Sequence, residues 1–567
     1  MKKFLIFILS VCQFITITAQ KKNPKWVDKA NKAIFTVEAT TKEGTTKTGT
    51  GFFIRENGEA VSSYELFRKA EKAVAITSAG ERLPITQILG ADDMYDVIRF
   101  KVTTPKKINF LTVATTSPVL HSAVFLPPSK EEPLTQGNIS EITKVKGTYN
   151  YFKIEKPLPL SQEGYPLLNE TGEVFALTQA DAAGKGNTYG ISIAYIQSLN
   201  ATATDMLKKT YSDIGIRKAW DSSVEDAQIA LMLYSSQQDV ATYLETLNDF
   251  IATFPNNPDG YNSRASHYAY NRQTLASNEN EQLQMLDMAW NDLENAAKYT
   301  QKKSDTFYNK AKLIFNIATS DSTLQYKEWN IQAAEDYIQK AIAEEDLPAY
   351  RQLEGDIAFY KGDYEKAYQS YEIVNQSPVV SGSSLYMAAK SKQQIPGSNL
   401  MEVITLIDSA IAKSHANEAA SYLLENVELK MQTGLYDLAV KDYDLYFLIM
   451  GGRVSDDFFY YREQAKFRNS DFEGALKDID IAISINSKNA IYHAEKASVY
   501  LRLNDYTKAQ ESAGEAIRLE PEFASAYRIL GVSLIRQNDK VEACKHLEKA
   551  KELGDPVVDR LIKENCN

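Results

Sequence analysis

The sequence predicts two domains of different class, an all-β domain followed by an all-α array of helical repeats. The chain has 567 residues, which is more than one hydrophobic core usually serves. Residues 26–205 contain short alternating apolar runs broken by glycine and proline, a pattern typical of β-strands. From residue 222 to 557 a motif recurs with a period of about 34 residues, which indicates stacked helical pairs.

Composition narrows the class of protein. Hydrophobic residues make up 44% and charged residues 24% of the chain, as in ordinary globular proteins. The net charge is -11, and acidic and basic residues are mixed without a long basic run. Because a nucleic-acid site needs clustered cations to neutralise phosphates, we expect no nucleic-acid partner.

Residues 1–20 are expected to be a signal peptide. Lys2 and Lys3 precede an apolar run that ends at Ile17, and the small residue Ala19 precedes the expected cleavage point. The apolar run is too short for a membrane-spanning helix. The sequence therefore predicts an exported protein, periplasmic or extracellular, for which association with the cell envelope is one expected setting.

Two alternatives concern cysteine. Cys12 would make the protein a lipoprotein, but Val11 before it is not the small residue that lipid attachment sites favour. Cys544 and Cys566 remain after cleavage, and in an oxidising compartment they are a candidate disulfide. The alternative for this pair is two buried thiols.

No metal site or other cofactor is expected. Four of the histidines lie on different predicted helices of the repeat array and show no ligand spacing among them. They are His267, His415, His493 and His546.

The β domain begins with a clear pattern of strands and turns. The segment KAIFTVEATTKEGTTKTGTGFFIRENGEAVSS predicts strand, loop and strand, then a turn at Asn57 and Gly58 and another strand. Several short strands of this kind predict a barrel or a sandwich.

Five segments of the β domain, in their order, resemble the Deg-type, trypsin-like serine proteases. The segments are GTGFFIRENGEAVSS, ADDMYDVIRFKV, GNISEITKV, SQEGYPLLNETGEVFAL and YGISIAYIQSL. The resemblance implies a double β-barrel over residues 26–205. It also implies that the segments carrying the catalytic histidine, aspartate and serine are the first, second and fourth.

The residues at the three catalytic positions depart from the family. Glu65, or Tyr64 if the register differs by one, stands where the resemblance places the histidine, and Asp96 stands at the aspartate position. The nucleophile loop, Gly-Asn-Ser-Gly-Gly-Pro in the family, runs from Ser161 to Pro166 here and has Glu163 in place of serine. A carboxylate is a poor attacker of an amide, so we expect no catalytic residues.

Other features of this domain bear on catalysis. Tyr165 replaces a glycine of the loop that would form the oxyanion hole, and we expect it to reshape that hole. The domain has one histidine, His121, which the resemblance places between the barrels. One hypothesis is that the three carboxylates converge and bind a hard cation. The alternative, which we favour, is that they point to solvent.

The repeats carry small and aromatic residues at fixed offsets. In RQLEGDIAFYKGDYEKAYQSYEIV, Gly355 is expected where two helices pack closely, and Gly362 with Asp363 makes the turn. Ala509 and Ala543 lie one period apart. This pattern resembles the tetratricopeptide repeat, a helix-turn-helix unit, and the resemblance implies a curved solenoid of about eight or nine units.

Further expectations concern the parts of the array. The segment ASNENEQLQ is expected to be an insertion, and residues 558–567 a capping helix and tail. The many tyrosines and alanines are expected to pack in the core. The concave surface of such arrays commonly holds peptides or proteins, so we expect a protein or peptide partner there.

Three functions remain open from the sequence. The first is an exported, non-catalytic scaffold or adaptor with a pseudoprotease domain. The second is an active trypsin-like endopeptidase whose repeats recognise substrates, for example with Ser161 as the nucleophile. In the third, the repeats carry the whole function and the barrel is a spacer or lid.

Overall fold

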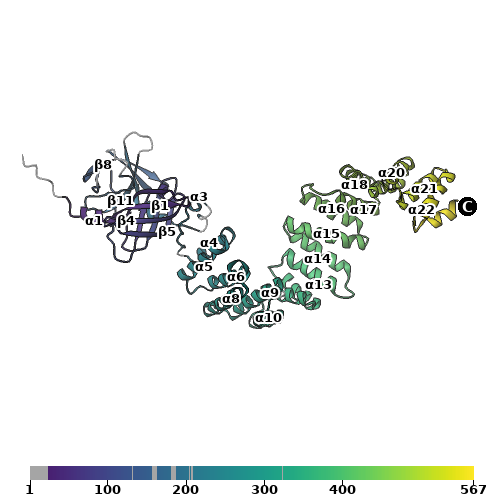
Figure 1. The fold of residues 1–567 in the computed structure, drawn as a ribbon, viewed down its shortest axis with the longest axis horizontal. Helices are drawn as coiled ribbons and strands as arrows, with labels where there is room; N and C mark the ends of the chain where they lie inside the picture. The colour runs from purple at the N-terminus through teal and green to yellow at the C-terminus, as the bar shows by residue number, and fades with distance from the viewer. Residues whose placement is uncertain are drawn as a thin grey trace, which may run out of the picture. The chain divides into compact units, whose positions relative to one another are not determined.

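The structure is a computed structural model, and it describes residues 23–129, 132–155, 162–180, 187–202, 205, 208–221, 223–321 and 324–566. The chain divides into two compact units. Unit 1 comprises Met1–His267 and Gln273–Ser277, and unit 2 comprises Tyr268–Arg272 and Asn278–Asn567. The strands belong to unit 1, and helices make up the described part of unit 2 (Figure 1). The expected signal peptide, residues 1–20, lies outside the described residues.

Two closed antiparallel barrels form the N-terminal domain, as predicted. The first has the strand order β1-β2-β3-β6-β5-β4 and the second β10-β11-β12-β9-β8-β7. The strands are β1 (Ile34–Thr41), β2 (Thr46–Phe53), β3 (Glu59–Ser62), β4 (Ala70–Thr77), β5 (Arg82–Asp92), β6 (Val97–Val102), β7 (Ala123–Leu126), β8 (Thr135–Val145), β9 (Tyr149–Ile154), β10 (Pro166–Leu168), β11 (Val174–Ala180) and β12 (Thr188–Ser192). Short helices α1 (Val27–Ala33), α2 (Ile193–Ser198) and α3 (Lys209–Ser212) flank them.

Glycines in the segment GTGFF leave room for apolar side chains of the first barrel. Gly51 pairs with Phe35 between β1 and β2, and a Cβ atom at Gly51 would lie 2.9 Å from the Phe35 ring. A Cβ atom at Gly49 would lie 2.5 Å from Leu66. The predicted turn between β2 and β3 is present, and Gly58 supplies its positive φ of 89°.

A connector after the barrels holds the first helices on unit 1. The backbone N–H of Ile88 donates to Arg217, and that of Ala219 donates to Ile88, at 2.7 and 2.8 Å. Trp220 then packs edge-on against Phe250, with ring centroids 5.2 Å apart. The helices α4 (Val224–Gln237), α5 (Val240–Thr253) and α6 (Pro258–Tyr270) follow this connector.

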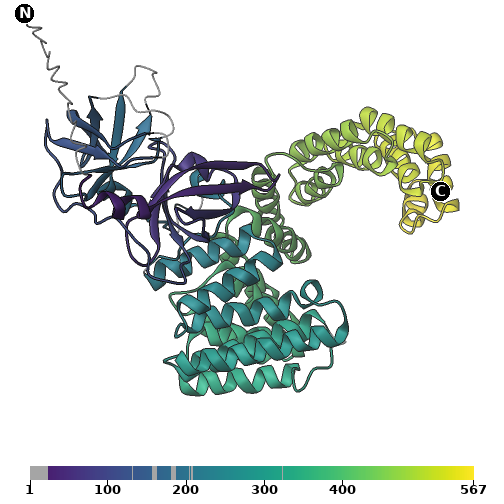
Figure 2. The same cartoon turned by 60° about the vertical axis from the view of Figure 1, so that its left-hand side comes forward.

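Helices of unit 2 pack as consecutive antiparallel pairs, α9 with α10 and so on to α21 with α22 (Figure 2). The helices are α7 (Arg272–Leu275), α8 (Glu279–Tyr299), α9 (Lys303–Ser320), α10 (Ile331–Glu344), α11 (Pro348–Lys361), α12 (Tyr364–Asn375), α13 (Gly382–Gln394), α14 (Leu400–Lys413), α15 (Ala416–Gln432), α16 (Tyr436–Ile449), α17 (Asp456–Arg468), α18 (Phe472–Ile485), α19 (Ala490–Arg502), α20 (Tyr506–Leu519), α21 (Ala524–Arg536), α22 (Lys540–Glu552) and α23 (Val558–Asn565). Within α7, Arg272 belongs to unit 2 and the following residues belong to unit 1.

The turn between paired helices explains the sequence period. Gly362 ends α11 in a left-handed conformation, and the side chain of Asp363 caps α12 by accepting from the backbone N–H of Lys366. Aspartate caps the second helix again at Asp471 and Asp505. The same aspartate cap therefore recurs in several helical pairs, whereas α16 follows Leu435 without a side-chain cap.

Two segments complete the array. The segment ASNENEQLQ, expected to be an insertion, contains the start of α8, which begins at Glu279 and is capped by Asn278. At the other end, a disulfide joins Cys544 of α22 to Cys566, with 5.7 Å between the Cα atoms. In the described part of the chain, no helix combines the length and apolar character that a membrane span requires.

Candidate functional site

Asp96 lies in the turn between β5 and β6, with a positive φ of 48°. Its carboxylate accepts hydrogen bonds from the Ser63 hydroxyl at 2.6 Å and from the Glu65 backbone N–H at 2.8 Å. Burial raises the pKa of Asp96, although these two hydrogen bonds act to lower it. Each oxygen of the Asp96 carboxylate thus accepts a hydrogen bond from its own barrel.

The two residues considered for the histidine position, Tyr64 and Glu65, have different environments. Tyr64 is buried in the first barrel, its hydroxyl donates to Thr210, and burial raises its pKa to about 12. Glu65 contacts Asp96 through its backbone, because its N–H donates to the Asp96 carboxylate. Its exposed carboxylate pairs with Lys47 at 2.9 Å and Arg68 at 3.2 Å, and these cations lower its pKa.

Glu163 is exposed on the loop that precedes β10. Gly164 next to it has a φ of 78°, and its backbone N–H donates to Thr178 at 3.0 Å. Ser161, the alternative nucleophile, lies outside the described residues.

The structure does not place the three carboxylates in a cation site. Among the described residues, which include Glu65, Asp96 and Glu163, no three His, Cys, Asp or Glu side chains are grouped to hold a metal ion. His121 is exposed on the turn before β7, in the second barrel.

Comparison with known proteins identifies both parts of the chain. Residues 49–177 match the trypsin-like peptidase domain family, and residues 494–556 match the tetratricopeptide repeat family. The chain has a trypsin-like peptidase domain and tetratricopeptide repeats. This agrees with the double barrel and with the helical pairs.

Individual similar proteins cover only parts of the chain. The small glutamine-rich tetratricopeptide repeat-containing protein 2 of Saccharomyces cerevisiae is 24% identical over 30% of this chain and 45% of its own length. The E3 ubiquitin-protein ligase CHIP of Arabidopsis thaliana is 26% identical over 16% of this chain and 32% of its own length. The chain thus spans less than half of these curated relatives.

Two similar solved structures are proteases. The HtrA-type protease AlgW with tripeptide is 16% identical, with a TM-score of 0.27, over 30% of this chain and 60% of that chain. The serine endoprotease from Yersinia pestis is 17% identical, with a TM-score of 0.26, over 34% of this chain and 69% of that chain.

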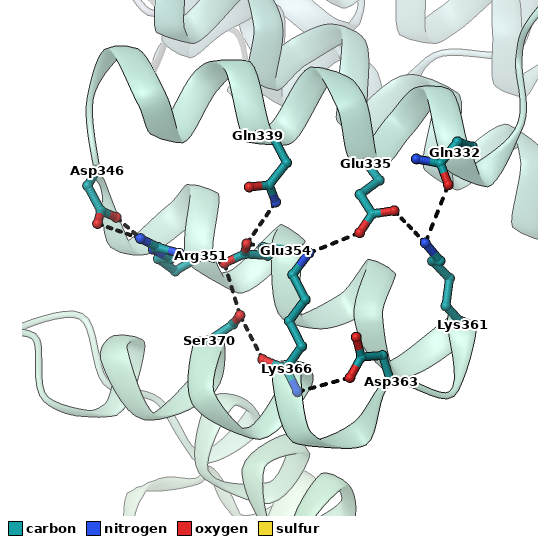
Figure 3. Close-up of polar contacts among 10 residues, drawn as sticks. All are labelled: Gln332, Glu335, Gln339, Asp346, Arg351, Glu354, Lys361, Asp363, Lys366 and Ser370. Carbon is teal, nitrogen blue, oxygen red and sulfur yellow. Dashed lines mark hydrogen bonds and ion pairs between the residues drawn. The ribbon is translucent and has the colours of Figure 1, made fainter.

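A polar network connects three helices of the repeat array, α10, α11 and α12 (Figure 3). Glu354 is 4% exposed and accepts hydrogen bonds from Gln339 and Arg351 at 2.8 Å each and from Ser370 at 3.0 Å. Burial raises the pKa of Glu354, but these hydrogen bonds outweigh it, so the pKa lies below its usual value. Glu354 is therefore a satisfied buried carboxylate.

Carboxylates also pair with the other cations of this network. Glu335 contacts Lys361 and lies 2.9 Å from Lys366, and Arg351 lies 2.7 Å from Asp346. A cavity of about 460 Å³ beside the network is lined by Arg351 and Lys366, both already in ion pairs. We interpret this network as a structural link between repeats.

A larger cavity of about 780 Å³ lies among α15, α16 and α17, and we call it the tyrosine pocket. It is lined by Leu424, Val427, Glu428, Met431, Tyr443, Tyr446, Arg453, Val454, Ser455, Asp457, Phe458, Tyr461 and Gln464. This pocket was not predicted from the sequence, because the tyrosines of the repeats were expected to pack in the core. That assignment is wrong for Tyr461, which is 55% exposed. The sequence feature that could have indicated this pocket is the density of aromatic residues on both sides of Gly451 and Gly452.

Proposed function

We propose that the chain is an exported, non-catalytic protein that binds proteins or peptides through its repeats, with the trypsin-like domain as a pseudoprotease. One observation carries the proposal. Asp96 is hydrogen-bonded to Ser63 and to the Glu65 backbone, and His121 is the one histidine in residues 26–205. A serine protease needs a histidine between its aspartate and its nucleophile, and Glu65 stands there instead.

The chemistry at Glu65 supports the same proposal. A general base must accept a proton from the nucleophile near neutral pH. Lys47 and Arg68 lower the pKa of Glu65, which makes its carboxylate a weaker base. Glu163, at the serine position, is itself an anion and would repel a developing oxyanion.

Binding and export have separate support. The relatives share tetratricopeptide repeats with this chain, and the repeat array holds the tyrosine pocket, a cavity of ligand size. A disulfide joins Cys544 to Cys566. Disulfides persist in oxidising compartments, so this bond supports export of the chain.

A fluorophosphonate probe tests the proposal on the purified full-length chain, together with a casein digestion assay. We expect no labelling and no digestion under conditions in which trypsin shows both. Labelling that disappears in Ser161→Ala would overturn the proposal in favour of an active endopeptidase. Co-purification from native envelope fractions tests the binding role, and an absence of any specific partner there would argue against it.

A further inference from the structure

We propose that the tyrosine pocket binds an extended peptide segment in which a bulky apolar side chain lies next to an aspartate or glutamate. The inference rests on the proposed binding function and names the chemistry of its ligand. Three features of the pocket support it: hydroxyl groups without acceptors, a cation without a counter-ion, and an open aromatic surface.

Three tyrosine hydroxyls line the pocket. They belong to Tyr443, Tyr446 and Tyr461, and within the described part of the chain no protein atom accepts a hydrogen bond from them. Tyr443 is only 8% exposed, and burial together with nearby Tyr461 raises its pKa to about 12. Because these hydroxyls have no acceptor in the described protein, a ligand that enters the pocket can supply one.

Tyrosines elsewhere in the array show which acceptor suits them. Their hydroxyls donate to carboxylates of the same or a neighbouring helix at 2.6 to 2.9 Å. The pairs are Tyr326 with Asp287, Tyr350 with Asp305, Tyr371 with Asp356, Tyr422 with Glu418, and Tyr492 with Asp457. A ligand carboxylate would give the pocket tyrosines the same partner.

Charge at the pocket is mixed, and one cation of the lining is placed to meet a ligand carboxylate. Arg453 follows the Gly451–Gly452 turn and is exposed, and no described carboxylate lies within ion-pair distance of its guanidinium. Its Nε donates to the Met450 carbonyl at 3.5 Å, and its other N–H groups can form charge-assisted hydrogen bonds with a ligand carboxylate. Glu428 and Asp457, which accepts from the Tyr492 hydroxyl, are the two carboxylates of the lining and oppose an acidic ligand.

The apolar part of the pocket fits a large side chain. Phe458 lies beneath the tyrosines, stacked on Tyr446 at 5.7 Å and edge-on to Tyr443 at 5.5 Å between ring centroids. Leu424 and Tyr461 are 45% and 55% exposed at the opening. An open pocket lets a chain continue on both sides, so the structure assigns the carboxylate to an Asp or Glu side chain and not to a chain end.

Peptide titrations monitored by fluorescence anisotropy test this inference on the full-length chain. The probes are labelled, C-terminally amidated peptides in which Phe, Leu or Met precedes one Glu in a Gly-Ser background. We expect binding that weakens about tenfold when Gln replaces that Glu, the loss typical of one charged hydrogen-bond partner.

Variants of the lining give opposite expected effects. Arg453→Gln should weaken binding about tenfold, and Tyr446→Phe and Tyr461→Phe should each weaken it about threefold to tenfold. Glu428→Gln should strengthen binding, because it removes a like charge. Matched controls are Arg536→Gln and Tyr360→Phe, exposed residues of other repeats that should leave binding unchanged.

Three results would overturn the inference. The first is equal affinity for the Glu and Gln peptides, and the second is binding that Arg453→Gln does not change. The third is binding that requires a free C-terminal acid, which would move the carboxylate to a chain end. None of these results would overturn the proposed function. That proposal would fail instead if the fluorophosphonate probe labelled the chain or if no partner were found.

Discussion

The α10–α12 network and the tyrosine pocket are both polar regions of one repeat array, but they differ in how their polar groups are satisfied. In the network, Glu354 receives three hydrogen bonds from the protein and Glu335 pairs with two lysines. In the pocket, the tyrosine hydroxyls and Arg453 face a cavity. Buried polar groups that hydrogen-bond to each other contribute to stability. Hydrogen-bond donors that face a cavity are available to a ligand.

Removing Glu354 should have the largest effect on stability. Glu354→Ala leaves Arg351, Gln339 and Ser370 without their shared acceptor, and we expect a loss of about 3–5 kcal/mol in local stability. Hydrogen exchange of residues 331–375 measures this loss. Peptide binding at the tyrosine pocket should not change. An unchanged exchange rate would show that the network is not structural.

Close packing in the same region is tested by Gly355. A Cβ atom there would lie 2.7 Å from the ring of Tyr371, which is fully buried. Gly355→Ala should therefore destabilise this helical pair by about 1–3 kcal/mol in hydrogen-exchange measurements. Gly514→Ala is the matched control, because no atom lies within 4 Å of its added Cβ atom. The control should stabilise α20 by about 0.5–1 kcal/mol.

A buried acid beside the tyrosine pocket should make stability depend on pH. Burial and the nearby Glu495 raise the pKa of Glu463 to about 8, and Gln464 of the pocket donates to its carboxylate. The folded state then holds a proton that the unfolded state releases above its usual pKa of 4.5, so stability falls as pH rises through this window.

Thermal unfolding followed by circular dichroism checks this dependence. The midpoint should fall by about 5 °C between pH 6 and pH 8.5. Glu463→Gln cannot ionise, and it should remove most of that fall. Equal pH dependence in the variant and the parent chain would exclude Glu463 as its cause.

The smallest expected change in stability is at the pocket tyrosines. Tyr446→Phe and Tyr461→Phe remove hydroxyls that no described protein atom accepts from, so thermal stability should stay within about 0.5 kcal/mol. Tyr371→Phe is the contrasting variant, since its hydroxyl donates to Asp356 at 2.8 Å. That change should cost about 1–2 kcal/mol. Similar losses at all three positions would remove the distinction between the two regions.

Local sequence patterns were sufficient for the fold class. Alternation of apolar residues predicted an all-β domain, and the resemblance to trypsin-like proteases implied the double barrel. The offsets of Gly355 and the Gly362–Asp363 turn predicted the helical pairs. These features depend on residues close in the chain, which a single sequence displays directly. The sequence did not show that ASNENEQLQ contains a helix start, where Asn278 caps the long helix α8.

Partners of individual side chains depended on contacts between distant segments. The sequence placed Glu65 and Asp96 near each other, but the pairing of Glu65 with Lys47 required the strands to be in register. Likewise, Tyr371 and Tyr446 are both tyrosines of repeat helices. Tyr371 has a carboxylate acceptor on a neighbouring helix, whereas Tyr446 faces a cavity. Periodicity sets which face a residue occupies, and the three-dimensional packing of other segments sets what it meets there.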